Sequence, residues 1–271
     1  MIVNRVWQWH FGKALVRSPD NFGLLGEQPT HPELLDWLAV HFVRSGWSLK
    51  ELHRLILTSA TYRMSTQFRA DYDERDPENK LLWRMNRRRL EAESVRDAIL
   101  VACGRLDSQM QGSLLPTANR AYVTSTASVN PQVYNTDRRS VYLPVVRSAL
   151  FDMFQAFDFA DPSTLNGQRD STTVAAQALF MMNSQFVEEQ SAALARELES
   201  LSDVATEDRV SQLFERVLGR APSPDEVASA QHYVADYNSR VGQPAADHGN
   251  LAGWHSLCRI LLSSNEFMYV E

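Results

Sequence analysis

Two helix starts of the same chemical type follow each other between residues 27 and 63, and this pair constrains the fold more than any other feature of the chain. Thr30 has the side chain of a helix N-cap, and Glu33 three residues later completes a capping box. Ser48 and Glu51 repeat the arrangement after a short connection. Because the connection is short, we expect two packed helices in a hairpin-like arrangement.

The same helical periodicity recurs along the rest of the chain. We predict further helices over residues 91–103, 150–157, 174–182, 185–201, 208–218, 223–237 and 251–262. Residues 140–145 are the best strand candidate, and residues 81–85 have the pattern of a short extended segment. The expected fold is mainly α, a multi-helix globular domain with at most a few short strands. We divide it into a main helical domain over residues 1–201 and a small C-terminal helical subdomain over residues 202–271.

The composition is that of an ordinary globular protein, with 44% hydrophobic and 22% charged residues. The net charge of -6 argues against a general nucleic-acid binder, which usually has a basic excess. No apolar run reaches the roughly 18 residues of a membrane-spanning helix, so we expect no membrane insertion. No secretory signal is visible, yet residues 1–11 already have helical periodicity with no cap before them. We therefore expect a chain that was cut out of a longer protein.

The motifs of standard catalytic and metal sites are missing from the sequence. The histidines show none of the spacings HxH, HxxxH or HExxH, so no metal site is predicted. Cys103 and Cys258 are isolated and belong to no CxxC or CxxCH motif, so we expect no haem or other cofactor in this chain. The two thiols are either buried and free or joined in one disulfide, and the sequence leaves both possibilities open.

A polar cluster at the end of the second predicted helix is the first candidate ligand site. Arg54, Thr58 and Tyr62 are spaced four residues apart and share one helix face, and Arg63 adds a further donor. Such a group can bind an anion or a sugar hydroxyl through charge-assisted hydrogen bonds. The alternative is a buried network that closes the helix C-terminus, since Ser and Thr readily bond to nearby backbone.

Arg88 and Arg89 end a run of three arginines and extend the candidate site toward phosphate, sulfate or carboxylate groups. The alternative is a solvated charged face, in which these arginines pair with acids of the same segment. Asp158, Asp161 and Arg169 are weaker candidates, because two carboxylates close together can act as an acid/base pair. Nothing in the sequence shows that their side chains converge, and the Ser and Thr residues that follow are more simply the cap of the next helix.

Eight short motifs occur in a fixed order along nearly the whole chain. They are Val3–Trp7, Gly12–Gly23, Pro29–Leu38, Leu57–Arg63, Arg88–Glu93 with Arg96–Ala98, Ser171–Thr173, Gln177–Leu179 and Ser264–Phe267. In this order they resemble the planctomycete-specific C-terminal domain of unknown function, of the PSD-one type. The family pattern normally continues upstream of residue 1, so the chain resembles a truncated copy or a fragment. Val174 stands where the family commonly has proline, a change that should matter little.

The resemblance also implies a context. Domains of this family typically lie at the C-terminal end of large exported bacterial proteins, after a c-type cytochrome module and a second planctomycete-specific domain. The resemblance therefore implies an extracytoplasmic location and these two modules as partners. Haem would be held only by the neighbouring modules and not by this chain. No biochemical activity is established for the family, so the resemblance assigns no catalytic residues.

These observations favour a non-catalytic binding or interaction domain, accessory to an exported cytochrome c-containing protein. Its ligand would be a partner protein or an anionic glycan, and the missing catalytic motifs support this interpretation. One alternative is a polysaccharide-active hydrolase, in which the acidic and arginine clusters converge in one cleft. Another is a purely structural scaffold, and whether the chain is an enzyme stays open at this stage.

Overall fold

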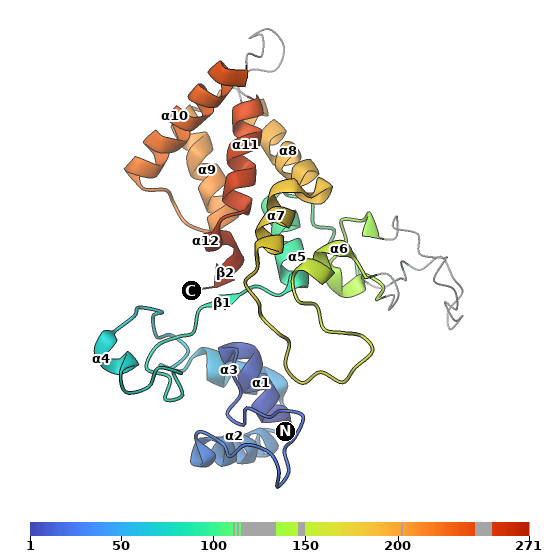
Figure 1. Cartoon of the computed structure of the whole chain (residues 1–271), viewed down its shortest axis with the longest axis vertical. Helices are drawn as coiled ribbons and strands as arrows, with labels where there is room; N and C mark the ends of the chain where they lie inside the picture. Colours follow the sequence, from blue (N-terminus) through green and yellow to red (C-terminus); the bar gives the residue numbers. More distant parts are fainter. Residues whose placement is uncertain are drawn as a thin grey trace. The chain divides into compact units, whose positions relative to one another are not determined.

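The computed structural model describes residues 1–110, 112, 114, 134–145, 150–201, 203–241 and 251–270. Within these ranges the fold is mainly α with one two-stranded antiparallel sheet, which confirms the expected fold class (Figure 1). The chain divides into two compact units. Unit 1 comprises Met1–Arg89, Thr164–Arg169 and Tyr269–Glu271, and unit 2 comprises Leu90–Ser163 and Asp170–Met268. The division near residue 201 that we drew from the sequence stays a prediction.

Unit 1 is built around three amphipathic helices. Its described elements are α1 (Ile2–Phe11), α2 (Pro32–Arg44), α3 (Leu49–Leu57), α4 (Ala70–Asp73), β1 (Arg88–Arg89) and β2 (Tyr269–Val270). Apolar residues at helical spacing on α1, α2 and α3 face one another and form a common core. The buried members of this core are Val3, Val6, Trp7, Phe11, Leu15, Leu38, Phe42, Leu52, Ile56 and Met85.

The second predicted helix start is confirmed. The Ser48 hydroxyl accepts a hydrogen bond from the Glu51 N–H at 3.3 Å, and α3 follows directly. Before it, α2 ends and Gly46 takes the left-handed conformation with φ 73°. The short connection packs α2 against α3 in the expected hairpin-like arrangement.

The first predicted helix start is wrong by one residue. His31 is the N-cap of α2, without a side-chain hydrogen bond, and Pro32 is the first helical residue. The Thr30 hydroxyl instead donates to the Leu15 carbonyl at 3.4 Å. A residue before proline prefers extended backbone, which keeps His31 outside the helix.

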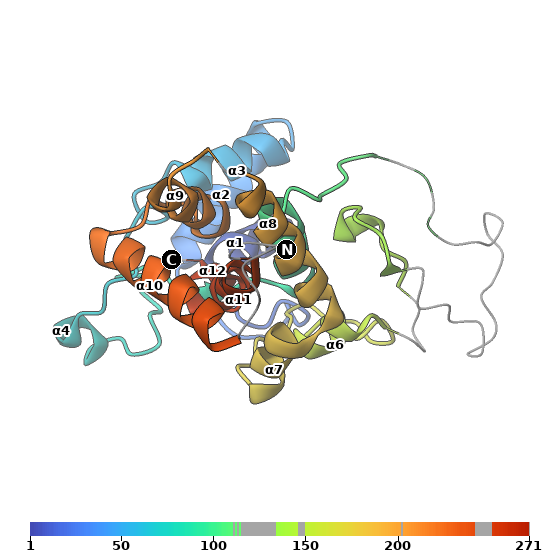
Figure 2. The ribbon, with the colours of Figure 1, turned by 90° about the horizontal axis from the view of Figure 1, so that it is seen from above.

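Unit 2 is a helical assembly in which α11 is central. Its described helices are α5 (Ala92–Ala102), α6 (Asp152–Ala156), α7 (Ala175–Asn183), α8 (Gln185–Ser200), α9 (Thr206–Leu218), α10 (Pro224–Val241), α11 (Leu251–Leu262) and α12 (Asn265–Met268). Helix α11 packs against both α8 and α10, and the two views agree on this (Figures 1 and 2). Trp254 and Leu262 of α11 are fully buried, as are Leu194 and Leu198 of α8.

The strand that we predicted over residues 140–145 is not formed. Ser140–Tyr142 is a short 3-10 helix instead. The reason lies in α5, where the Arg96 side chain is fully buried. Its guanidinium donates to the carbonyls of Thr136 and Arg138 and to the Ser140 hydroxyl. These hydrogen bonds fix the turn that precedes the 3-10 helix.

Asp97 completes this network from the adjacent position of α5. Its carboxylate accepts hydrogen bonds from the Ser140 N–H at 2.9 Å and from the Ser140 hydroxyl at 2.7 Å. Arg96 Nη1 lies 3.4 Å from the same carboxylate, which partly compensates the buried positive charge. Both side chains therefore serve to hold the chain around Ser140 in place.

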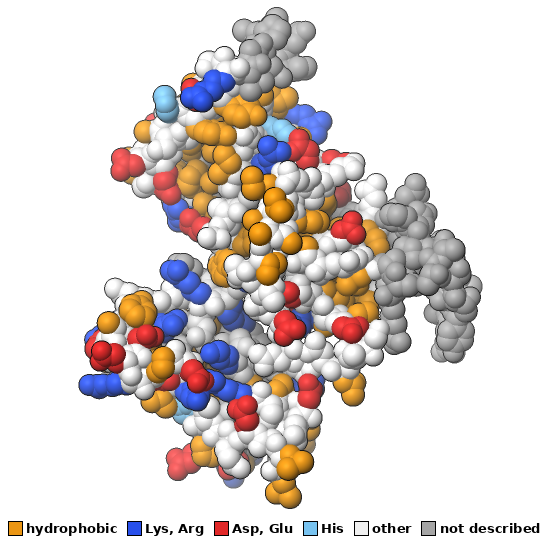
Figure 3. All heavy atoms as spheres, in the orientation of Figure 1, with side chains coloured by type: hydrophobic (Ala, Val, Ile, Leu, Met, Phe, Trp, Pro, Cys, Tyr) orange, Lys and Arg blue, Asp and Glu red, His pale blue; other side chains and the backbone are white. Residues whose placement is uncertain are grey.

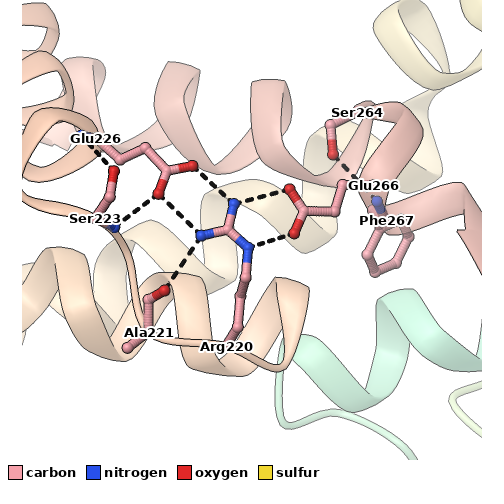
Figure 4. A network of polar contacts seen from close by, with 7 residues as sticks. All are labelled: Arg220, Ala221, Ser223, Glu226, Ser264, Glu266 and Phe267. Atoms are coloured by element: carbon pink, nitrogen blue, oxygen red, sulfur yellow. Dashed lines mark hydrogen bonds and ion pairs between the residues drawn. The ribbon is translucent and has the colours of Figure 1, made fainter. Parts of the chain in front are cut away.

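An arginine with two carboxylates joins the start of α10 to α12 in unit 2 (Figure 4). The Arg220 guanidinium donates to both oxygens of Glu226, at 2.9 and 2.7 Å, and to both oxygens of Glu266, at 2.5 and 2.9 Å. A capping box also forms at the start of α10. Glu226 Oε2 accepts from the Ser223 N–H at 2.7 Å, and the Ser223 hydroxyl accepts from the Glu226 N–H at 3.3 Å.

Both cysteines of the chain are buried and free. Burial raises the pKa of the Cys103 thiol to about 12, and it also raises the pKa of Cys258. Most of the segments 107–137 and 241–250 lies outside the described residues. No helix in the described ranges is both long and apolar enough to cross a bilayer.

Candidate functional site

Part of the polar cluster predicted at the end of α3 makes only local contacts within that helix. The Arg54 guanidinium pairs with Glu51 at 2.5 Å, and both side chains are exposed. The Thr58 hydroxyl donates to the Arg54 carbonyl at 2.8 Å and so closes the last turn of α3. Arg63 is exposed on the same unit. The Thr58 hydroxyl therefore follows the alternative interpretation of the sequence, in which Ser and Thr side chains bond to nearby backbone.

Tyr62 and Arg88, in contrast, both approach the end of α1. The Tyr62 ring lies edge-on to the rings of His10 and Phe11, with centroid distances of 5.6 and 5.8 Å. Arg88 Nη1 donates to the Trp9 carbonyl at 2.8 Å. The structure thus brings together two residues of the predicted cluster, and it places His10 beside them.

His10 is itself half of a histidine pair. Its Nε2 atom lies 2.7 Å from Nδ1 of His53 on α3, and the two rings are nearly perpendicular, at 73°. This distance is that of a hydrogen bond, in which one ring donates its proton and the other accepts it. This hydrogen bond needs one proton between the two facing nitrogens. If both facing nitrogens carried a proton, the hydrogen bond would be lost.

The surroundings keep His10 in its neutral form. Partial burial, then the neighbouring His53 and the guanidinium of Arg88, lower the pKa of His10 below its ordinary value of 6.5. Neutral imidazole is the form that accepts a proton or a metal ion through its free nitrogen. The pair can therefore share a proton, accept a further one at low pH or bind a metal ion.

The remaining predicted site residues belong to other segments of the two units. Arg89 is half-buried in β1, opposite Tyr269 of β2. Arg169 belongs to unit 1, whereas Asp158 and Asp161 belong to unit 2.

The two aspartates hold local turns of the chain. Asp158 has a φ of 57° and accepts hydrogen bonds from the Thr172 N–H and hydroxyl, each at 2.8 Å. Asp161 accepts from the Ser163 N–H at 2.8 Å. Each of the two carboxylates holds its own loop.

A second feature of unit 1 is a small cationic hollow, which we define by Lys13, Arg17, Lys80 and Arg84. Lys13, Arg17 and Lys80 line it together with Trp7 and other residues, and Arg84 lies within electrostatic range of Lys13. The predicted extended segment at residues 81–85 is an irregular turn instead. The hollow has a volume of about 10 Å³, which is about that of one water molecule. A ligand would therefore rest on it rather than enter it.

Positive charge exceeds negative charge around this hollow. Glu78 accepts a hydrogen bond from Arg17 at 2.6 Å and lies 3.3 Å from the Lys80 ammonium. These two cations lower the pKa of Glu78, which therefore stays ionised at neutral pH. Burial, followed by the charge of Arg17, lowers the pKa of the Lys13 ammonium, and the nearby carboxylates offset this only in part.

Unit 1 as a whole also carries an excess of positive charge. Residues 1–89 contain more Lys and Arg than Asp and Glu, although the whole chain has 27 of the former and 33 of the latter. On the face seen in Figure 3, Lys and Arg side chains gather over the part of unit 1 between α4 and α1, with acidic side chains among them. The basic excess is therefore local and was hidden in the net charge of the chain.

Sequence reasoning missed both the histidine pair and the hollow. His10 and His53 are 43 residues apart and form no motif, so only the packing of α1 on α3 brings them together. Lys13, Arg17 and Lys80 likewise come from two separate segments of the chain. A usable signal was the local basic excess of the first 89 residues.

One comparison with known proteins gives a match. The model of the family PSD1, a protein of unknown function (DUF1553), matches residues 1–234. No curated protein and no solved structure matches the chain. The matched residues cover unit 1 up to β1 and most of unit 2, in agreement with the resemblance drawn from the sequence motifs. The chain therefore belongs to the PSD1 family of proteins of unknown function.

Proposed function

We propose that this chain is a non-catalytic binding domain whose unit 1 recognises acidic groups of a polysaccharide at the cationic hollow. The observation that supports this most is that the four cations of the hollow outnumber the two nearby carboxylates, Glu78 and Asp76, so positive charge is left unbalanced at the surface. Sulfate and carboxylate are the groups that lysine and arginine bind through charge-assisted hydrogen bonds. An acidic glycan displays such groups repeatedly along a chain.

Two arginine atoms at the hollow support an incoming acceptor. The Nε atoms of Arg17 and Arg84 are buried and have no hydrogen-bond partner. A buried donor without a partner costs about 1–3 kcal/mol. An acceptor oxygen that reached either Nε would recover this cost, although the side chain would first have to shift.

The shape of the hollow favours a surface ligand over a small molecule. Small-molecule sites are usually pockets of roughly 300–1,000 Å³, whereas this hollow has a volume of about 10 Å³. A polymer can instead lie across it and use several weak contacts at once.

The proposed setting comes from the family resemblance. We place the domain in an exported, cytochrome c-containing protein of planctomycete type, where it would act as an accessory to the haem module and the second family-specific module. In that setting it would anchor the protein on acidic extracellular polysaccharide. No observation in the described residues favours the polysaccharide-hydrolase alternative, because Asp158 and Asp161 hold separate turns.

Binding to matched polysaccharides tests this proposal. The full chain is titrated with dextran sulfate, with unsulfated dextran of equal length as a control and with polygalacturonate as a carboxylate ligand. We expect binding to the two acidic polymers that weakens with salt, and none to dextran. Equal binding to dextran sulfate and dextran, or no binding to either acidic polymer, would overturn the proposal.

Two variants locate the binding surface. Lys13→Gln combined with Lys80→Gln removes two cations of the hollow and should weaken binding about tenfold, which corresponds to about 1.4 kcal/mol. Lys50→Gln removes an exposed lysine of α3 and should leave binding unchanged. If the double variant bound as the unchanged chain does, the hollow would not be the binding surface.

A further inference from the structure

We infer that His10 and His53 form a two-imidazole binding site for a divalent transition-metal ion such as Zn²⁺. This site is independent of the cationic hollow and of the proposed glycan binding. It rests on the contact between His10 Nε2 and His53 Nδ1 at 2.7 Å, in which two ligand nitrogens from different helices point at each other.

The distance between the two nitrogens is close to that of a metal site. Zinc binds imidazole nitrogen at about 2.0–2.1 Å, so two ligands of one ion lie about 2.9–3.4 Å apart for angles between right and tetrahedral. The pair, at 2.7 Å, needs to open by about half an ångström. The two rings must also turn, so that both nitrogen lone pairs aim at one ion instead of at each other.

The helices that carry the pair are held by the core. His10 is followed in α1 by buried Phe11, and His53 is preceded in α3 by buried Leu52. The Tyr62 ring packs edge-on against the His10 ring at a centroid distance of 5.6 Å. Ligands mounted on fixed helices and supported by packing are the arrangement that a metal site requires.

Protonation favours metal binding at neutral pH. Burial, His53 and Arg88 together lower the pKa of His10, and a neutral ring is the form that ligates a metal ion. The charge of Arg88 opposes a bound cation. His10 lies in the last turn of α1, however, where the negative end of the helix dipole favours one. Arg88 is also held by the Trp9 carbonyl at 2.8 Å.

The two rings would leave coordination positions open. No group of three or more His, Cys, Asp or Glu side chains suited to a metal ion occurs in the described ranges. Water or an external donor would therefore complete the coordination, as in zinc sites that keep an exchangeable position. Cys103 and Cys258 do not compete in the folded chain, because both thiols are buried and the pKa of each is raised.

Nitrogen NMR on the histidine rings of the unchanged full chain tests the inference directly. ZnCl₂ is added to less than one equivalent at neutral pH, and the ring nitrogens are followed one by one. We expect selective shifts at His10 Nε2 and His53 Nδ1 and at no other histidine. Shifts at other histidines instead, or none at all, would overturn the inference, as would shifts produced by inorganic phosphate but not by Zn²⁺.

Variants give a second and independent readout. His10→Asn and His53→Asn should each weaken Zn²⁺ binding at least about tenfold in calorimetry, since even the loss of an outer partner of a ligand costs about 10–100-fold. His41→Asn on α2 is the matched control, because His41 stacks on Trp37 and lies outside the pair. Unchanged affinity in either pair variant would contradict the site. Circular dichroism confirms that each variant is folded before it is scored.

Discussion

His10 Nε2 lies 2.7 Å from His53 Nδ1, so two histidines 43 residues apart in the sequence share one hydrogen bond. The contact forms because α1 and α3 pack on one core, with Phe11 and Leu52 buried beside the pair. Arg88 and Tyr62 approach the same place from two further segments. The end of α1 therefore gathers polar side chains from several segments of unit 1.

The stability of unit 1 should decrease as the pH falls below about 6.5, the ordinary pKa of histidine. The pKa of His10 is lowered in the folded chain, so the unfolded chain takes up the proton first and folding weakens as the pH falls. Hydrogen exchange of the backbone amides of α1 and α3, followed as the temperature rises, measures the unfolding temperature of unit 1. His10→Asn should reduce the pH dependence and His41→Asn should not. An unfolding temperature unchanged between neutral and mildly acidic pH would refute it.

Gly12→Ala should raise the pKa of His10. Gly12 has a φ of 76°, and a Cβ there would lie 2.5 Å from Arg88 Cδ, so the arginine must move away. Removal of its charge takes away one cause of the lowered pKa. The left-handed conformation also costs a non-glycine residue about 1–2 kcal/mol.

Gly46→Ala separates the two effects of Gly12→Ala. Gly46 has a φ of 73°, but a Cβ there meets open space. The Gly46→Ala variant should therefore lose about as much stability as Gly12→Ala but leave the pKa of His10 unchanged. An NMR titration of His10 in both variants measures the difference, and equal shifts would show that Arg88 plays no part.

Arg96→Leu should destabilise unit 2 by at least about 2 kcal/mol, because each buried acceptor left without a donor costs about 1–3 kcal/mol. The variant leaves the carbonyls of Thr136 and Arg138 without their buried donor. Arg139→Gln is the control, since that neighbouring side chain is exposed. Urea unfolding measures the loss, and faster exchange of the Ser140 amide would locate it. A loss no larger than that of the control would contradict the assigned role.

Unit 2 should lose stability as the pH falls from about 4.5 toward about 2. The hydrogen bond from Arg220, followed by that from the Ser223 N–H, lowers the pKa of Glu226 to about 2. The unfolded chain is protonated first, so the stabilising contribution is lost as the pH falls through this window. Glu226→Gln should shrink the acid dependence of unfolding, whereas Glu215→Gln on the exposed face of α9 should not. If the two variants showed the same dependence of unfolding on acidic pH, the contact between Arg220 and Glu226 would not be the source of the acid sensitivity.

Local signals predicted the helices well where one short segment contains all the information. The capping box of Ser223 and Glu226 and the Ser48 cap are formed within four residues, and both are present in the structure. At Thr30 the pattern was the same, yet the following proline and a tertiary contact to Leu15 moved the helix start. The pattern alone does not reveal such a competing partner.

The rest depends on contacts between distant segments. Residues 140–145 look like a strand by composition, but the buried guanidinium of Arg96 fixes a different conformation from 44 residues away. The same holds for the candidate site. Tyr62 and Arg88 were selected for their chemistry, whereas His10 and His53 were set aside because no motif spacing joins them. Helix packing, which the sequence does not specify directly, creates that pair.

Chemical labelling of the lysines tests the central proposal most directly. The chain contains three lysines, of which Lys13 and Lys80 line the cationic hollow and Lys50 lies on the exposed face of α3 as an internal reference. The full chain is acetylated with and without dextran sulfate, and the extent at each lysine is read by mass spectrometry. We predict that Lys13 and Lys80 become protected while Lys50 does not. Equal labelling of Lys13 and Lys80 with and without the polymer, under conditions where it binds, would contradict the proposal.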